Sequence, residues 1–147
     1  MQRIWNRLRK RFRKPKRYYN IDGFVLDMGE HHLLSAYQED CPMFSRFIPY
    51  LGELGQKVRP TGGVIIDLGA NVGDTAAAMI KHTNANILCI EPTNVYYALL
   101  EKNILLLDPL GARIKTLQAF ISDKKQGYQA DVSGGGTAVQ KESLRPE

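Results

Sequence analysis

Residues 64–75 read Val64-Ile65-Ile66-Asp67-Leu68-Gly69-Ala70-Asn71-Val72-Gly73-Asp74-Thr75. The continuous β-branched run at the start is typical of a short strand that is covered on both faces. A turn follows, in which Gly69 is expected to allow a sharp bend and Gly73 the close approach of a ligand. A helix is predicted over 74–82. Ligands of open parallel sheets bind at the carboxyl ends of the strands, so this turn is the candidate ligand-binding loop.

The alternation of strands and helices continues after this loop. An apolar strand is predicted over 87–90, a helix over 93–107 and a third strand over 114–121. Short connections between them indicate a parallel sheet with right-handed crossovers. The predicted fold class is therefore α/β, with the first three parallel strands of a Rossmann-like fold and their crossover helices. No further strand is predicted, so we expect an incomplete sheet. The expected core residues of the second helix are Val95, Leu99 and Leu106.

A hairpin and a helix are predicted before the loop. Residues 18–28 alternate loosely around Asp22-Gly23, which is a typical two-residue hairpin turn. Asp40 is expected to cap the helix that follows. The apolar residues of that helix recur at helical spacing and are expected to form one buried stripe. This stripe comprises Phe44, Phe47, Ile48, Leu51 and Leu54.

The chain accordingly divides into four segments. Residues 1–17 form a basic tail, and residues 18–62 form an extension that contains the hairpin and the helix. Residues 63–123 form the ligand-binding half of the Rossmann-like domain. Residues 124–147 contain the glycine-rich stretch 133–136, so we expect a flexible segment and a domain that is cut short.

Composition and charge narrow the range of functions. The chain has 147 residues, of which 44% are hydrophobic, which suits one domain with a core and excludes a disordered chain. No apolar run approaches the roughly 18 residues of a membrane-spanning helix. The net charge of +5 arises in residues 1–17, which hold nine basic residues and no acid, whereas the rest has 11 basic and 15 acidic residues. A body with net negative charge disfavours nucleic acid as a partner.

The basic tail has two interpretations. A helix over residues 2–13 would place Trp5, Leu8 and Phe12 on one side, which favours a weak contact with an anionic membrane. A solvated arm is the other interpretation and the commoner state of such termini. Two cysteines and no signal-peptide pattern indicate a cytoplasmic setting, membrane-peripheral where the tail binds lipid.

The residues around the loop also indicate its ligand. Glu91 follows the second strand, where a carboxylate suits the two ribose hydroxyls of an adenosine. A dinucleotide loop has the pattern G-x-G-x-x-G, but the equivalent positions here are Gly69, Asn71 and Asp74. Asp74 would repel a pyrophosphate at the start of the helix. S-adenosylmethionine has no phosphate and carries an ammonium group, for which Asp67 is well placed.

This region resembles the FkbM family of S-adenosylmethionine-dependent methyltransferases. The resemblance rests on residues 64–75, on Ile90-Glu91-Pro92, on residues 117–123 and on residues 43–51, and it covers roughly residues 30–125. It implies a class I methyltransferase fold, S-adenosylmethionine as cofactor, and O-methylation of a sugar hydroxyl or a natural product. The acceptor is then a small molecule or a glycan. Family members continue with a strand of Lys-Ile-Asp-x-Glu-Gly type, which this sequence lacks.

Carried over by position, the resemblance assigns each part of the cofactor to residues of this chain. Asp67, Gly69, Asn71 and Gly73 would frame the methionine half, Glu91 would hold the ribose, and the end of the third strand would border the adenine. The complete set of candidate cofactor residues is Asp67, Gly69, Ala70, Asn71, Gly73, Asp74, Thr75, Glu91, Pro92, Phe120, Ile121 and Ser122.

The sequence assigns no catalytic base and no metal. His31 and His32 are candidates for the base only by residue type, and together with His82 they are expected to be surface side chains. A metal site formed by His31, His32 and Cys41 lacks the spacing of a ligand set.

Two other functions stay open. A catalytically incomplete module would bind a nucleotide or pair with a partner chain, such as a second copy in a homo-oligomer, because the missing strands leave the first strand as an exposed edge. An NAD-dependent oxidoreductase is disfavoured by Asp74 and by the missing glycines.

Overall fold

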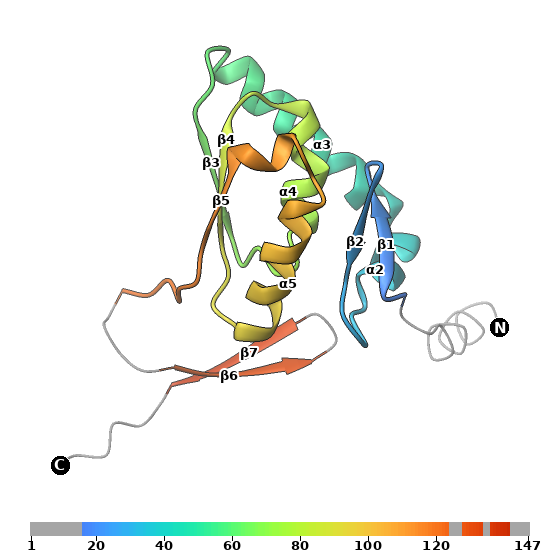
Figure 1. The fold of residues 1–147 in the computed structure, drawn as a ribbon, viewed down its shortest axis with the longest axis vertical. Helices are drawn as coiled ribbons and strands as arrows, with labels where there is room; N and C mark the ends of the chain where they lie inside the picture. The colour runs from blue at the N-terminus through green and yellow to red at the C-terminus, as the bar shows by residue number, and fades with distance from the viewer. Residues whose placement is uncertain (1–15, 124–127, 134–135, 142–147) are drawn as a thin grey trace.

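The computed structural model describes residues 16–123, 128–133 and 136–141. It is an α/β fold in which helices cover one face of a three-stranded parallel sheet, compatible with a Rossmann-like arrangement (Figure 1). The helix predicted over residues 2–13 lies outside the described residues. Within the described part of the chain, no helix has both the length and the hydropathy of a membrane span.

The parallel sheet consists of β3 (Val64–Leu68), β4 (Asn86–Ile90) and β5 (Ile114–Leu117), in the order β3-β4-β5. The last hydrogen bond between the β4 and β5 sides of the sheet runs from the Glu91 N–H to the Leu117 carbonyl, at 3.1 Å. The third strand is therefore shorter than the predicted 114–121. The next N–H on the β5 side is that of Thr93, which donates to Glu91 Oε1 at 2.9 Å, so the ladder does not continue.

The crossover helices are close to the predicted ranges. α4 (Asp74–Met79) continues as the 3-10 helix η1 (Ile80–His82), and α5 spans Asn94–Leu105. Both α4 and α5 lie on the same face of the sheet (Figure 1). The Thr93 side chain caps α5 by accepting a hydrogen bond from the Tyr96 N–H.

The buried side of α5 differs from the one predicted. Val95 and Leu106 are more than half exposed, and Leu99 is only partly buried. Apolar residues occur on all sides of this helix, so their spacing does not identify the side that faces the core. The buried residues of this region are Tyr96, Leu100, Asn103 and Leu107.

One face of β3 is open. Val64, Ile66 and Leu68 point to this face and are 64%, 59% and 60% exposed. The prediction of a strand covered on both faces is wrong for the described residues, because both crossover helices pack on the opposite face. In the described part of the chain β3 is also an edge strand, paired with β4 alone.

The predicted hairpin is confirmed. It consists of β1 (Tyr18–Ile21) and β2 (Phe24–Asp27), paired antiparallel. Asp22 and Gly23 have φ angles of 49° and 90°, as a type I′ turn requires. The hairpin packs against α4 and α5 on the side away from the sheet (Figure 1).

An unpredicted helix, α2 (Leu34–Asp40), precedes α3 (Pro42–Val58). Asp40 is therefore the last residue of α2 and does not cap α3. Cys41 takes the cap position of α3 and makes no side-chain cap hydrogen bond. Pro42 at the first helical position can start α3 without such a cap, because its ring presets the helical φ.

Only part of the predicted stripe of α3 is buried. Ile48 and Leu51 pack against the core, whereas Phe47 and Leu54 are 52% and 42% exposed. The side chain of Phe44 lies outside the described residues. α3 packs on α4 and η1, and these elements cover only part of its apolar stripe.

Two strands occur where a flexible segment is expected. β6 (Tyr128–Ser133) pairs antiparallel with β7 (Gly136–Lys141), separately from the parallel sheet. Val132 packs against the core. Ser133 and Gly136, the two ends of the stretch 133–136, pair with each other.

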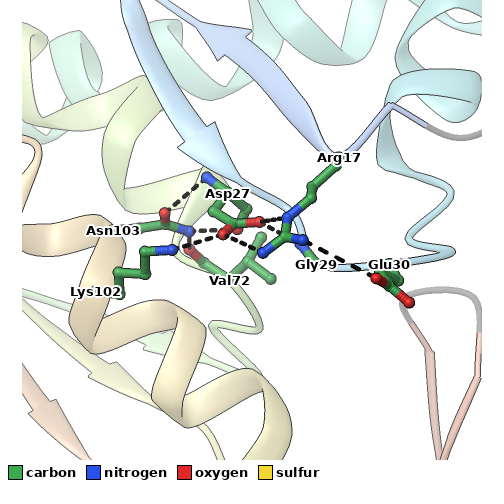
Figure 2. A network of polar contacts seen from close by, with 7 residues as sticks. All are labelled: Arg17, Asp27, Gly29, Glu30, Val72, Lys102 and Asn103. Carbon is green, nitrogen blue, oxygen red and sulfur yellow. Dashed lines mark hydrogen bonds and ion pairs between the residues drawn. The ribbon is translucent and has the colours of Figure 1, made fainter.

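A buried carboxylate joins the hairpin to α5. Asp27 is 1% exposed, and its carboxylate accepts hydrogen bonds from Lys102, Arg17 and the Gly29 N–H (Figure 2). The Lys102 Nζ lies 2.7 Å from Oδ2. Burial alone would raise the pKa of Asp27, but the hydrogen bonds from Lys102 and Arg17 outweigh burial and lower the pKa to about 2.

The Asn103 side chain joins three backbone groups. Its Oδ1 accepts a hydrogen bond from the Asp27 N–H at 2.8 Å. Its Nδ2 donates to the carbonyls of Asp27 and Val72, at 2.9 and 2.8 Å. Val72 belongs to the loop after β3, so α5 holds the hairpin and the loop together (Figure 2).

Asp27→Asn is expected to lower the free energy of unfolding by about 2 kcal/mol at pH 7. A neutral amide lacks the negative charge that attracts the Lys102 and Arg17 side chains. The pKa of folded Asp27 lies below its ordinary value of 3.8. Its stabilising effect is therefore present above about pH 4 and is lost as the pH falls toward 2. Urea unfolding at pH 7 and pH 2.5 measures the effect, with Glu101→Gln, an exposed carboxyl on α5, as the control. An equal loss at both pH values would contradict the prediction.

Candidate functional site

In the loop after β3, residues 69–73, three backbone N–H groups donate to backbone carbonyls. Gly69 and Ala70 both donate to the Ile90 carbonyl, at 2.8 and 3.0 Å, and Gly73 donates to the Ala70 carbonyl at 2.8 Å. A loop that binds a pyrophosphate presents such N–H groups to its ligand. Here they hold the loop to β4 and to itself, so the loop is poorly suited to a phosphate.

A carboxylate occupies the start of α4. Asp74 is the first residue of α4 and places a carboxyl group in its first turn. Burial raises the pKa of Asp74 to about 6, and the backbone N–H groups of Asp74 and Thr75 oppose that rise. The carboxylate takes the position in which an anionic ligand would bind to the helix, which again disfavours a phosphate.

Asp67 presents an unsatisfied oxygen at the carboxyl end of β3. Its Oδ2 is buried and has no hydrogen-bond partner among the described residues. Burial raises the pKa of Asp67 to about 6, with further contributions from the charges of Asp74 and Glu91. Buried polar atoms are normally bonded, so this oxygen is a candidate partner for a cationic group of a ligand.

Glu91 holds the loop in place. It is 3% exposed, and its Oε2 accepts a hydrogen bond from the Asn71 N–H at 2.9 Å. Its Oε1 accepts from the N–H and the hydroxyl of Thr93, at 2.9 and 2.7 Å. Three of about four acceptor positions of the carboxylate are thereby used. One acceptor position is left, and the contact predicted for Glu91 involves two ribose hydroxyls. That contact therefore requires one of these donors to move.

The φ of Gly69 agrees with the sharp bend expected there, whereas Gly73 faces α5 and not an open space for a ligand. A Cβ at Gly73 would lie 2.9 Å from Leu100 Cδ1, so this glycine is needed for packing against α5. A Cβ at Gly69 would meet no described atom within 4 Å. Gly69 is therefore the position at which a ligand can approach the backbone, although its φ of 76° also favours glycine.

The residues predicted to border the adenine lie after the sheet. Phe120 is partly buried, and Ile121 and Ser122 are exposed. Gln118, which the sequence did not single out, donates from its side chain to the Pro92 carbonyl at 3.4 Å. The segment after β5 is thereby linked to the loop after β4, at the same end of the sheet as Asp67.

The three histidines differ in burial. His31 is exposed, and His82 is partly buried with its Nε2 3.1 Å from Asp22 Oδ2. The expectation of a surface side chain is wrong for His32, which is 5% exposed and lies 3.0 Å from the Asn71 side chain. Its closeness to the loop depends on how the extension folds back, and no pattern in the sequence indicates it.

No metal centre is formed by the described residues, among which no three His, Cys, Asp or Glu side chains are arranged to hold an ion. Cys41 is exposed and Cys89 is buried, and both thiols are free. Burial raises the pKa of Cys89 to about 12, so its thiol is inert at neutral pH.

A pocket of about 330 Å³ lies at the opposite end of β3. Its lining includes Val58 at the end of α3, Val64 and Ile65 of β3, and Ala85 before β4. None of the predicted cofactor residues lines it. The loop after β3 therefore remains the candidate site, and its three carboxyl groups at Asp67, Asp74 and Glu91 suit a ligand with positive charge.

Alanine at the two loop glycines should have unequal effects. Gly73→Ala combines an unfavourable φ with a clash in the core, so we expect it to lower the free energy of unfolding by about 3 kcal/mol. Gly69→Ala meets no described atom and should lower it by about 1 kcal/mol, through its φ alone. Urea unfolding of both variants measures the difference. Equal losses would show that the space around the two glycines is not as described.

Comparisons of this chain with protein-family models, with curated proteins and with solved structures give no match.

Proposed function

We propose that the loop after β3 binds S-adenosylmethionine and that the protein is a methyltransferase. The proposal rests above all on Asp67, whose buried Oδ2 has no partner among the described residues and lies in the field of Asp74 and Glu91. The cofactor carries an ammonium and a sulfonium group and no phosphate, so its charge is complementary to this site. When bound, it supplies a methyl group on a positively charged sulfur.

The residues of the site fit this cofactor in different ways. Asp67 accepts the ammonium group, because an opposite charge satisfies its buried oxygen. Gly69 leaves the backbone open on the side where the ligand approaches. Asp74 and the bonded N–H groups of the loop favour this cofactor over NAD, which has a pyrophosphate.

The proposed acceptor is a hydroxyl group of a sugar or a natural product, which follows from the resemblance to the FkbM family. For such a transfer the protein holds the acceptor oxygen in line with the methyl group, and a base takes the hydroxyl proton. His32 does not suit the role of base, because both of its ring nitrogens are already bonded. A cytoplasmic location, with residues 1–17 on an anionic membrane, remains a prediction.

Asp67→Asn should change ligand affinity and stability in opposite directions. The variant loses the charge that holds the ammonium group, so affinity for S-adenosylhomocysteine at pH 8 should fall about tenfold or more. It also removes a buried charge without a partner, so the free energy of unfolding should rise by about 1 kcal/mol. Isothermal titration calorimetry and urea unfolding measure the two effects.

The control for charge alone is Glu101→Gln, which removes an exposed carboxyl far from the loop in sequence and should leave affinity unchanged. NAD titrated into the wild-type protein should give no heat of binding. The proposal fails if S-adenosylhomocysteine does not bind the wild-type protein, or if Asp67→Asn binds it equally well.

A second candidate function is pairing with another copy of this chain through β3. In the described residues β3 is an edge strand, and Val64, Ile66 and Leu68 are exposed on its open face. An antiparallel pair centred on Ile66 would place Val64 opposite Leu68 of the second copy, so the strand is complementary to itself. A stable dimer in sedimentation equilibrium without affinity for S-adenosylhomocysteine would favour this function over the first.

A further inference from the structure

Asn71 adopts a backbone conformation that needs support. Its φ is 50°, in the left-handed region, and it lies between two glycines, Gly69 and Gly73, with φ of 76° and 86°. The glycines adopt such angles freely, whereas asparagine adopts them more readily than other residues with a Cβ when its side chain is bonded. In this conformation the Asn71 N–H points to Glu91, to which it donates at 2.9 Å. The shape of the loop therefore depends on what holds Asn71.

His32 contacts the Asn71 side chain from the N-terminal extension. His32 Nε2 lies 3.0 Å from Asn71 Oδ1. The other ring nitrogen, Nδ1, accepts a hydrogen bond from the Leu34 N–H at 3.1 Å. A backbone N–H can only donate, so Nδ1 carries no proton in the neutral ring. Nε2 therefore carries the proton and donates it to Asn71 Oδ1.

The ring is held in this orientation by its surroundings. It packs edge-on against Tyr96 of α5, with ring centroids 5.7 Å apart and planes at 74°. Burial lowers the pKa of His32, so the ring is neutral at neutral pH. A hydrogen-bonded chain thus runs from His32 through Asn71 and Glu91 to Thr93, the cap of α5.

We propose that His32 is a positioning residue of the cofactor site, which holds Asn71 in its left-handed conformation and thereby shapes the loop after β3. The identity of the ligand in this inference rests on the proposed function. The contact between His32 and Asn71 does not depend on it. It gives the N-terminal extension a part in the site: residues 18–62 are predicted as a separate segment, yet one of their side chains supports the loop.

Two variants of His32 separate the contacts of the two ring nitrogens. In His32→Gln the amide nitrogen takes the place of Nε2 and can still donate to Asn71, whereas the bond from Leu34 is lost. In His32→Asn the amide oxygen takes the place of Nδ1 and can still accept from Leu34, whereas the side chain is too short for Asn71. We expect His32→Asn to weaken binding of S-adenosylhomocysteine about tenfold and His32→Gln to weaken it less than about threefold.

Asn71→Gly provides a second test. Glycine adopts a positive φ without support, so the loop should no longer depend on His32 when residue 71 is glycine. We expect His32→Asn to change affinity less than about twofold in the Asn71→Gly background. If His32 acts only through the bond from the Leu34 N–H, the opposite result is expected. His32→Asn would then keep the affinity and His32→Gln would lower it. The Asn71→Gly background would not change either effect.

Hydrogen exchange of the unliganded protein keeps this inference separate from the proposed function. The Asn71 N–H is bonded to Glu91, so its exchange reports the shape of the loop without any ligand. His32→Asn should speed this exchange about tenfold relative to the wild type, and His32→Gln should not. If wild-type protein does not bind S-adenosylhomocysteine but the exchange follows this pattern, the proposed function fails and the positioning role stands. Unchanged exchange in His32→Asn would overturn the positioning role.

Discussion

The amide of Asn103 is buried between three chain segments and bonds to the N–H and carbonyl of Asp27 and to the carbonyl of Val72. Each of these groups would lose about 1–3 kcal/mol if it were left unbonded away from water. The amide therefore fixes β2, the loop after β3 and α5 relative to one another. The N-terminal hairpin becomes part of the same folded unit as the candidate site, which is why His32 can reach Asn71.

The carboxyl groups of Asp27 and Asp67 have opposite pKa shifts. Asp27 is surrounded by donors, and its pKa is lowered to about 2 although burial opposes this. Asp67 has an oxygen without a described partner and two carboxyl groups nearby, and burial raises its pKa to about 6. A paired carboxylate stabilises the fold, whereas an unpaired one lowers stability and is typical of a functional site. This contrast distinguishes the candidate ligand contact from the structural ion pair.

The sequence predicted the elements that have strong local signals. The turn at Asp22-Gly23 and the helix that starts at Asp74 depend on residues next to each other in the chain. It did not predict which side of α5 is buried, because apolar residues occur on all sides of this helix. Nor did it predict the open face of β3, which depends on where both helices pack. It located the loop but not its internal bonds: Glu91 and His32 act through contacts between distant segments, which no spacing in the sequence reveals.

The charge state of Asp67 tests the proposed cofactor site most directly. NMR titration of its carboxyl carbon should give a pKa of about 6 in the protein alone. With saturating S-adenosylhomocysteine, the pKa should fall by about one unit or more, because a nearby ammonium group favours the ionised form, and NAD should leave it unchanged. Affinity would accordingly decrease as the pH falls below about 6. An Asp67 that titrates at the ordinary value of 3.8, or whose pKa S-adenosylhomocysteine does not change, would contradict the proposed site.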